Sequence, residues 1–146
     1  MCKILVLDLD KSIRILYADE LTDEGHEVIT IGDGSRLMAL ISKMGPDLVV
    51  MDIRLGHYNG LELLRDIRRS FYKLPVILCS SYPVFQGDME LDGASYYMVK
   101  SSNLNALKSM IKIALEGSTH PSSGVTYDKG GHPGEPIPVK QVRFPW

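Results

Sequence analysis

Residues 47–52 read Asp47-Leu48-Val49-Val50-Met51-Asp52, and this segment is the strongest indication of the architecture. Its apolar, partly β-branched interior is typical of a strand that is buried on both faces, as in a parallel sheet. Asp52 then falls at the carboxyl end of the strand, which is the edge where open α/β sheets gather ligands and chemistry. Polar groups from other strands at the same edge would make Asp52 part of a site.

Strands and helices alternate along the chain around this segment. Apolar runs predict strands at residues 3–8, 26–31, 47–52, 74–79 and 96–99, and helical spacing predicts helices at 12–24, 33–44, 61–69 and 104–115. Gly87 interrupts any helix at 84–92, so that segment is predicted to be poorly formed. Regular alternation predicts an α/β fold, a doubly wound (βα)5 arrangement with a parallel five-stranded sheet and helices on both faces.

Length and composition fit one domain. The chain has 146 residues, 45% apolar and 23% charged, with a net charge of -2, which gives no basis for direct nucleic-acid binding. Residues 1–116 are expected to form the domain. Residues 117–146 hold five of the eight prolines and five of the thirteen glycines, so we expect an irregular C-terminal tail and no independent domain.

The expected location is the cytoplasm. No apolar stretch approaches the ~20 residues needed to cross a bilayer, so no membrane association is expected. The first predicted strand begins almost at Met1, which leaves no room for a signal peptide. The two cysteines have no metal or redox spacing and fit reduced thiols. The histidines share no ligand spacing and are expected to be exposed.

Several polar side chains follow the predicted strands directly. They are Asp8 and Asp10 after the first strand, Asp52 after the third, Ser80 after the fourth and Lys100 after the fifth. Clustered carboxylates need a cation; Lys100 supplies one positive charge, and Mg²⁺ suits oxygen ligands together with a phosphoryl group. Such a pocket is suited to phosphoryl transfer, with Asp52 as the nucleophile.

At this point the chain resembles the response regulator receiver domains of two-component signalling, which have a CheY-like fold. The resemblance covers residues 3 to about 115 and rests on four segments. These are Lys3-Ile4-Leu5-Val6-Leu7-Asp8, Asp52-Ile53-Arg54-Leu55-Gly56-His57-Tyr58-Asn59-Gly60, Pro75-Val76-Ile77-Leu78-Cys79-Ser80 and Gly93-Ala94-Ser95-Tyr96-Tyr97-Met98-Val99-Lys100. It implies a flavodoxin-like strand order 2-1-3-4-5.

The resemblance also implies roles for individual residues. Asp52 would accept a phosphoryl group from a histidine kinase or phosphotransfer protein, and Lys100 would contact that group. Ser80 would be the switch hydroxyl and Tyr97 the aromatic switch, with Tyr96 as the competing candidate. Magnesium would be held by Asp8, Asp10, Asp52 and the backbone carbonyl of Arg54.

The implied output is a protein-binding switch and not an enzyme. The face made by helix 4 (the weak segment 84–92), strand 5 (96–99) and helix 5 (104–115) of the expected fold would meet a downstream protein target, and a homodimer could form through it. No output domain is expected in the tail, because 30 residues rich in Pro and Gly cannot build their own core.

Two alternatives stay open because of the segment Asp8-Leu9-Asp10. The family usually has a second acid where this chain has Leu9, so Leu9 could impair phosphorylation and leave a pseudo-receiver binding module. An Asp-x-Asp after an apolar strand also resembles haloacid-dehalogenase-type phosphatases, with Asp8 as nucleophile and Asp10 as general acid/base. Another departure from the family pattern, Ser101 in place of the usual proline after Lys100, weakens the resemblance little.

Overall fold

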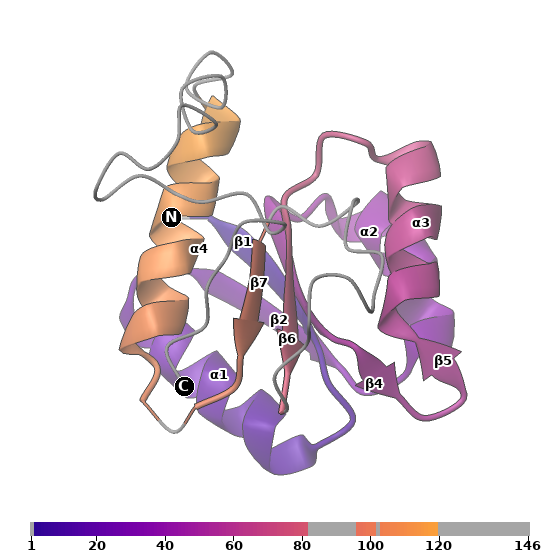
Figure 1. Cartoon of the computed structure of the whole chain (residues 1–146). Helices are drawn as coiled ribbons and strands as arrows, with labels where there is room; N and C mark the ends of the chain where they lie inside the picture. Colours follow the sequence, from indigo (N-terminus) through magenta and orange to yellow (C-terminus); the bar gives the residue numbers. More distant parts are fainter. Residues whose placement is uncertain (1, 82–95, 102, 120–146) are drawn as a thin grey trace, which may run out of the picture.

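The computed structural model describes residues 2–81, 96–101 and 103–119, and it contains a five-stranded parallel sheet (Figure 1). The strand order is β2-β1-β3-β6-β7. Its strands are β1 (Lys3–Leu7), β2 (Glu27–Ile31), β3 (Leu48–Asp52), β6 (Val76–Ser80) and β7 (Tyr96–Val99). All four pairings are parallel, so the predicted fold and strand order are confirmed.

Helices cover both faces of the sheet. Figure 1 shows α1 (Lys11–Asp23) and α4 (Asn105–Thr119) on one side, and α2 (Leu37–Met44) and α3 (Gly60–Ser70) on the other. Residues of β3 alternate between two apolar clusters, with Val49 and Met51 on the α2–α3 side and Leu48 and Val50 on the α1–α4 side. Burial on both faces explains why the central strands are apolar throughout.

The helix ends follow local signals in the sequence. Asp10, Asp33 and Asn59 each accept a backbone hydrogen bond two residues ahead, at the starts of α1, the 3-10 turn η1 (Gly34–Arg36) and α3. Gly25 has φ +94° and Gly45 has φ +58°, so both glycines end helices in the left-handed region. These two stops match the sequence prediction.

Three local predictions differ from the structure. Helical spacing in the sequence predicts Leu16 on the inner face of α1 with Tyr17 and Leu21, but Leu16 is 39% exposed, and Tyr17 and Leu21 are the buried residues of the helix. His26 was expected to be exposed but is partly buried, because it sits between the end of α1 and β2. The last helix continues to Thr119, past its predicted end at residue 115.

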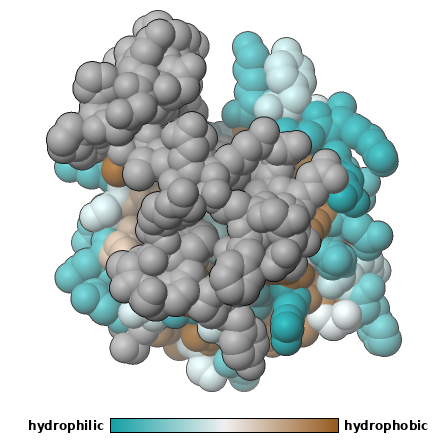
Figure 2. Space-filling model, in the orientation of Figure 1, coloured by the Kyte–Doolittle hydropathy of each residue, from teal (hydrophilic) through white to brown (hydrophobic). Residues whose placement is uncertain are grey.

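The outer surface of α3 is polar. Figure 2 shows teal side chains over the side where α3 lies, in agreement with its outward-facing Glu62, Arg65 and Arg69. No helix in the described ranges is long and apolar enough to cross a membrane. The prediction for residues 84–92 lies outside the described residues. So does the segment 139–144, where the sequence alternates apolar and polar residues in a pattern compatible with an edge strand.

Candidate functional site

Three charged side chains meet at the carboxyl edge of the sheet. Lys100 Nζ lies 2.6 Å from Asp8 Oδ2 and 2.8 Å from Asp52 Oδ2. Asp8 is only 3% exposed, and the Lys100 side chain is 13% exposed. The structure therefore brings Lys100 together with two carboxylates that lie 92 and 48 residues before it along the chain.

The register of the sheet produces this meeting. Leu7 of β1 lies beside Met51 of β3, so the next residue on each strand is a carboxylate: Asp8 on one and Asp52 on the other. On the other side of β3, Asp52 is paired with Cys79 of β6. Val99 of β7 pairs with the last residue of β6, and Lys100 follows it. Parallel strands that end together thus deliver all three groups to one edge.

Charge compensation dominates the electrostatics of the cluster. Burial acts against the charge on Lys100, but hydrogen bonds to Asp52 and Asp8 outweigh it, and the pKa of Lys100 is raised. Buried carboxylates are costly unless a cation and hydrogen bonds accompany them. Lys100 is therefore a protonated counter-ion shared by both carboxylates.

The loop after β1 directs only one carboxylate into the cluster. Asp8 Oδ1 accepts a hydrogen bond from the Asp10 amide at 2.9 Å. Asp10 itself caps α1, accepting from Ser12 N at 2.9 Å and Ser12 Oγ at 2.8 Å, and the Ser12 hydroxyl lowers its pKa. Leu9 is 49% exposed. The structure thus places the Asp10 carboxylate at the helix start rather than beside Asp52.

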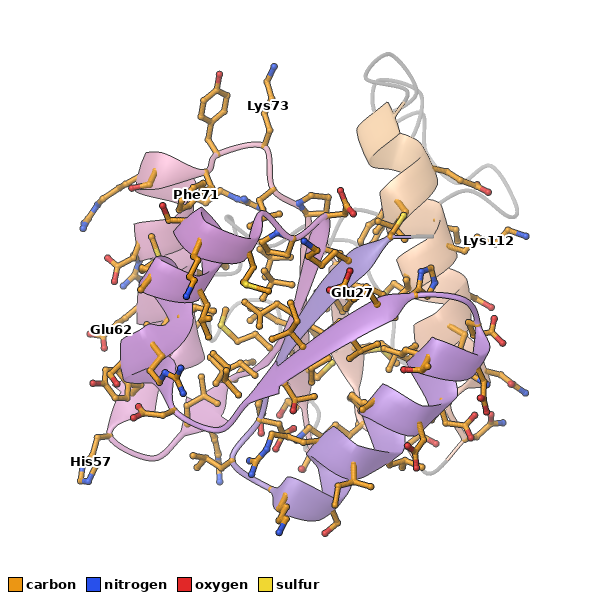
Figure 3. All side chains as sticks on the ribbon, turned by 180° about the vertical axis from the view of Figure 1, so that it is seen from behind. Glu27, His57, Glu62, Phe71, Lys73 and Lys112 are labelled. Atoms are coloured by element: carbon orange, nitrogen blue, oxygen red, sulfur yellow. The ribbon has the colours of Figure 1, made fainter. Side chains whose placement is uncertain are left out.

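The segment after Asp52 forms a small hairpin that the sequence had not indicated. β4 (Arg54–Leu55) pairs antiparallel with β5 (Tyr58–Asn59) across a turn at Gly56 and His57. Gly56 has φ +69°, the left-handed conformation that two-residue hairpin turns require. In Figure 3 His57 projects outward from the corner of this turn.

Two contacts hold the hairpin against the end of β3. Asp52 Oδ1 accepts a hydrogen bond from the Arg54 amide at 3.3 Å. A Cβ on Gly60 would lie 2.5 Å from the Asp52 carbonyl oxygen, so the first residue of α3 must be glycine. The Gly60 amide donates to the Ile53 carbonyl at 2.8 Å. The backbone beside the Asp52 carboxylate is therefore tightly fixed.

Ser80 and Tyr97 form a second, buried pair. Ser80 is 6% exposed and Tyr97 is 0% exposed. Burial raises the pKa of Tyr97, and a side-chain hydrogen bond with Ser80 acts in the opposite direction. Tyr97 belongs to the apolar cluster on the α2–α3 side, whereas Tyr96 belongs to the cluster on the α1–α4 side. Of the two tyrosines, Tyr97 is thus the one that contacts the hydroxyl at the end of β6.

The oxygen donors for a metal are limited. Asp8 and Asp52 supply two carboxylates, and the described residues contain no group of three or more His, Cys, Asp or Glu side chains that could hold a metal ion. Mg²⁺ binds through one or two protein carboxylates with water and phosphate oxygens, so two carboxylates fit such an ion. Asp10 is not in this donor set.

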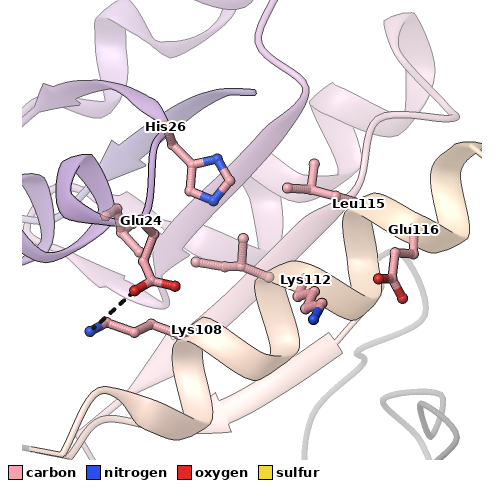
Figure 4. Close-up of a pocket in the computed structure, with 8 residues that line it drawn as sticks. Glu24, His26, Lys108, Lys112, Leu115 and Glu116 are labelled. Atoms are coloured by element: carbon pink, nitrogen blue, oxygen red, sulfur yellow. Dashed lines mark ion pairs between the residues drawn. The ribbon is translucent and has the colours of Figure 1, made fainter. Parts of the chain in front are cut away.

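A separate hollow of about 350 Å³ lies between the end of α1 and the second half of α4 (Figure 4). Its floor is apolar, with Leu21, Ile111 and Leu115, and its rim carries His26 and charged residues of both signs. The hollow includes His26, the residue just before β2, so it lies toward the amino edge of the sheet, opposite Asp52. It takes no part in the cluster around Lys100.

Comparison with known proteins settles the family. The family model for the response regulator receiver domain matches residues 4–112. The chain belongs to the response regulator receiver domain family. The family is a signalling module of two-component systems, so the expected family and its role are confirmed. Nothing in the comparisons favours the phosphatase or pseudo-receiver alternatives.

Relatives and solved structures agree with this assignment. The regulatory protein PhoP of Bacillus subtilis is 29% identical over 136 residues, covering 87% of this chain and 55% of PhoP. The chain spans between about a quarter and about half the length of the curated relatives it matches. Those relatives are named as regulatory or transcriptional regulatory proteins.

Among solved structures, Thermotoga maritima TrrA in complex with Mg(2+)-BeF is 33% identical, with a TM-score of 0.74, covering 78% of this chain and 99% of TrrA. TrrA in complex with the histidine kinase ThkA is 35% identical to this chain, with a TM-score of 0.73, covering 79% of this chain and 99% of TrrA.

Proposed function

We propose that this chain is a phosphoryl-accepting switch in which Asp52 receives a phosphoryl group from a histidine kinase or phosphotransfer protein. The observation that carries the proposal is the Lys100 ammonium held between Asp8 and Asp52 in a buried cluster. The kinase complex of the similar protein TrrA supports this class of donor.

The chemistry follows from the positions of these groups. An Asp52 carboxylate oxygen forms the new bond to phosphorus as the bond from phosphorus to the donor imidazole nitrogen breaks, and that nitrogen keeps the electron pair. Lys100 lies 2.8 Å from the accepting carboxylate, so its charge offsets the negative charge that collects on the phosphoryl oxygens. Asp52 needs no proton removed, because a carboxylate is already the nucleophilic form.

Magnesium belongs to the proposal as a cofactor. A bound Mg²⁺ supplies positive charge to the phosphoryl oxygens. Asp8, Asp52 and the backbone carbonyl of Arg54 would hold it. The expected fourth ligand, Asp10, is left out of this set because its carboxylate caps α1. The Mg(2+)-BeF complex of TrrA supports the choice of metal.

Ser80 and Tyr97 are proposed to transmit the change. The Ser80 hydroxyl lies in a buried position at the end of β6 and interacts with Tyr97. When a phosphoryl group is present on Asp52, Ser80 bonds its oxygens and gives up the tyrosine contact. Tyr97 then repacks within the α2–α3 cluster, and the surface near β7 and α4 changes.

This surface is proposed to bind a downstream protein target, and a homodimer could use the same face. The segment 84–92, predicted to be a poorly formed part of this face, lies outside the described residues. We place the partners in the cytoplasm, where free thiols such as those of Cys2 and Cys79 stay reduced.

Residues 1–116 are proposed to be the receiver unit and residues 117–146 its tail. Neither direct nucleic-acid binding nor catalytic turnover is proposed for the chain.

Intact-mass measurement with a small phosphodonor and Mg²⁺ tests the proposal. Wild type should gain one acid-labile phosphoryl group, and Asp52→Asn should gain none. Asp66→Asn is the matched control, because Asp66 lies on α3 and pairs with Arg69 at the surface. Label that persists on Asp52→Asn contradicts the site. A folded wild type that takes no label favours the pseudo-receiver alternative.

A further inference from the structure

Arg14 reaches back from α1 to the loop that carries Asp8. One guanidinium nitrogen, Nη1, donates to the Asp8 carbonyl at 2.6 Å and to the Leu9 carbonyl at 2.9 Å. Both acceptors are main-chain groups in the turn between β1 and α1. Arg14 thus bonds the backbone of the residue whose side chain contacts Lys100.

Gly32 provides the space for this guanidinium. A Cβ at Gly32 would lie 2.6 Å from Arg14 Nη1 and 3.0 Å from Arg14 Cζ, so any side chain there would displace the arginine head. Gly32 directly follows Ile31, whose carbonyl accepts the Asp8 amide at 3.1 Å. The guanidinium therefore lies at the common end of β1 and β2. It contacts the main chain that follows each strand, at Asp8 and Leu9 after β1 and at Gly32 after β2.

The side chain of Asp8 is fixed from two directions. Its Oδ1 accepts the Asp10 amide at 2.9 Å and its Oδ2 accepts Lys100 Nζ at 2.6 Å. Neither neighbour in the loop supplies a substitute, because Leu9 is exposed and Asp10 caps the helix. The position of this single loop carboxylate depends on the turn that Arg14 bonds.

We propose that Arg14, seated on Gly32, is a positioning residue that holds the Asp8 turn in the geometry needed for metal and phosphoryl binding. The inference rests on the proposed function and adds two residues to it. The planar guanidinium lies close to Gly32 and donates to two carbonyls, whereas a lysine ammonium is a point charge on a flexible stem. The charge alone does not replace the contact.

Three variants and a control test the proposal: Arg14→Lys, Arg14→Ala, Gly32→Ala and the control Lys108→Ala. Lys108 belongs to α4 and is a suitable control because it is also a cation that bonds α1. It pairs with Glu20 of α1 at 2.7 Å, away from the Asp8 turn. Two readouts are used: hydrogen exchange of the Asp10 amide by NMR, and the Mg²⁺ dissociation constant by calorimetry. The first readout does not require metal or phosphate.

In the Arg14 and Gly32 variants we expect the Asp10 amide to exchange about tenfold faster and Mg²⁺ to bind several-fold more weakly, the scale of one lost hydrogen bond. Lys108→Ala should leave both values unchanged. Gly32→Ala keeps the arginine but displaces its guanidinium, and Arg14→Lys keeps the positive charge. If Arg14→Ala does not fold, either of these two variants still tests the proposal.

The proposal is overturned if the variants lose thermal stability while Asp10 exchange and Mg²⁺ affinity stay within about twofold of wild type, since that result describes an ordinary stabilising contact. If wild type binds no Mg²⁺ and takes no phosphate, the proposed function fails. Faster Asp10 exchange in the variants would still support Arg14 as the residue that positions the turn.

Discussion

Replacing Lys100 by methionine removes the only described cation that contacts both Asp8 and Asp52. Breaking a buried ion pair by deleting one partner costs about 3–5 kcal/mol, because the remaining charge is left uncompensated. Lys100 keeps 13% side-chain exposure, so we expect the lower end, about 3 kcal/mol, at pH 7 without Mg²⁺. The loss is read from urea unfolding followed by far-UV circular dichroism.

The origin of this loss can be checked with magnesium, which can take the place of the missing cation in the cluster. Mg²⁺ should stabilise the variant more than wild type, since the ion then supplies the missing charge. The control Lys108→Met removes a surface cation and should cost much less.

Wild type should lose the contribution of Lys100 in alkali. The pKa of Lys100 is raised above its ordinary value of 10.5, so the folded state holds this proton more tightly than the unfolded state. Its contribution is therefore fully present below about pH 10 and declines above it. A deficit below about 1 kcal/mol in Lys100→Met, or one that Mg²⁺ does not reduce, would refute the reasoning about uncompensated carboxylates.

Three further predictions concern the loop, the hairpin and the tail. Leu9→Asp should tighten Mg²⁺ binding by about 1–3 kcal/mol in calorimetry, the scale of one added charged contact, and no gain would mean that another group already completes the site. Gly60→Ala should destabilise the protein by more than about 2 kcal/mol in urea unfolding, because its Cβ would lie 2.5 Å from the Asp52 carbonyl oxygen; a change within ±0.5 kcal/mol would show that the hairpin moves freely. Deleting residues 120–146 should preserve a cooperative thermal transition, since the five strands and their covering helices precede them, and loss of that transition would show that the tail belongs to the core.

The sheet and the place of the cluster could be predicted because they depend on patterns that local sequence carries. Apolar runs that end at Asp8, Asp52 and Lys100 predict parallel strands, and parallel strands bring their ends to one edge. No longer-range information was needed to expect those three groups at the same edge. Pairing distances and burial required the structure.

The remaining details depend on choices between competing local interactions. Asp10 could face the metal or cap the helix, and the Ser12 amide and hydroxyl two residues on favour the cap. The hairpin after Asp52 depends on the conformation of Gly56, and a glycine in a polar loop does not reveal its φ in advance. The reach of Arg14 onto Gly32 joins residues from two loops, so periodicity and spacing could not indicate it.

The same local choice sets the balance of charge in the site. With Asp10 engaged at the start of α1 and Leu9 exposed, the loop contributes one carboxylate, and Lys100 already contacts it together with Asp52. A Mg²⁺ ion must therefore share two carboxylates with a lysine that is 2.6 Å and 2.8 Å from them. Competition of this kind lowers metal affinity before phosphorylation, because ion and ammonium repel each other. The added charge of a phosphoryl group on Asp52 relieves that repulsion, so metal and phosphoryl binding should strengthen each other in this chain.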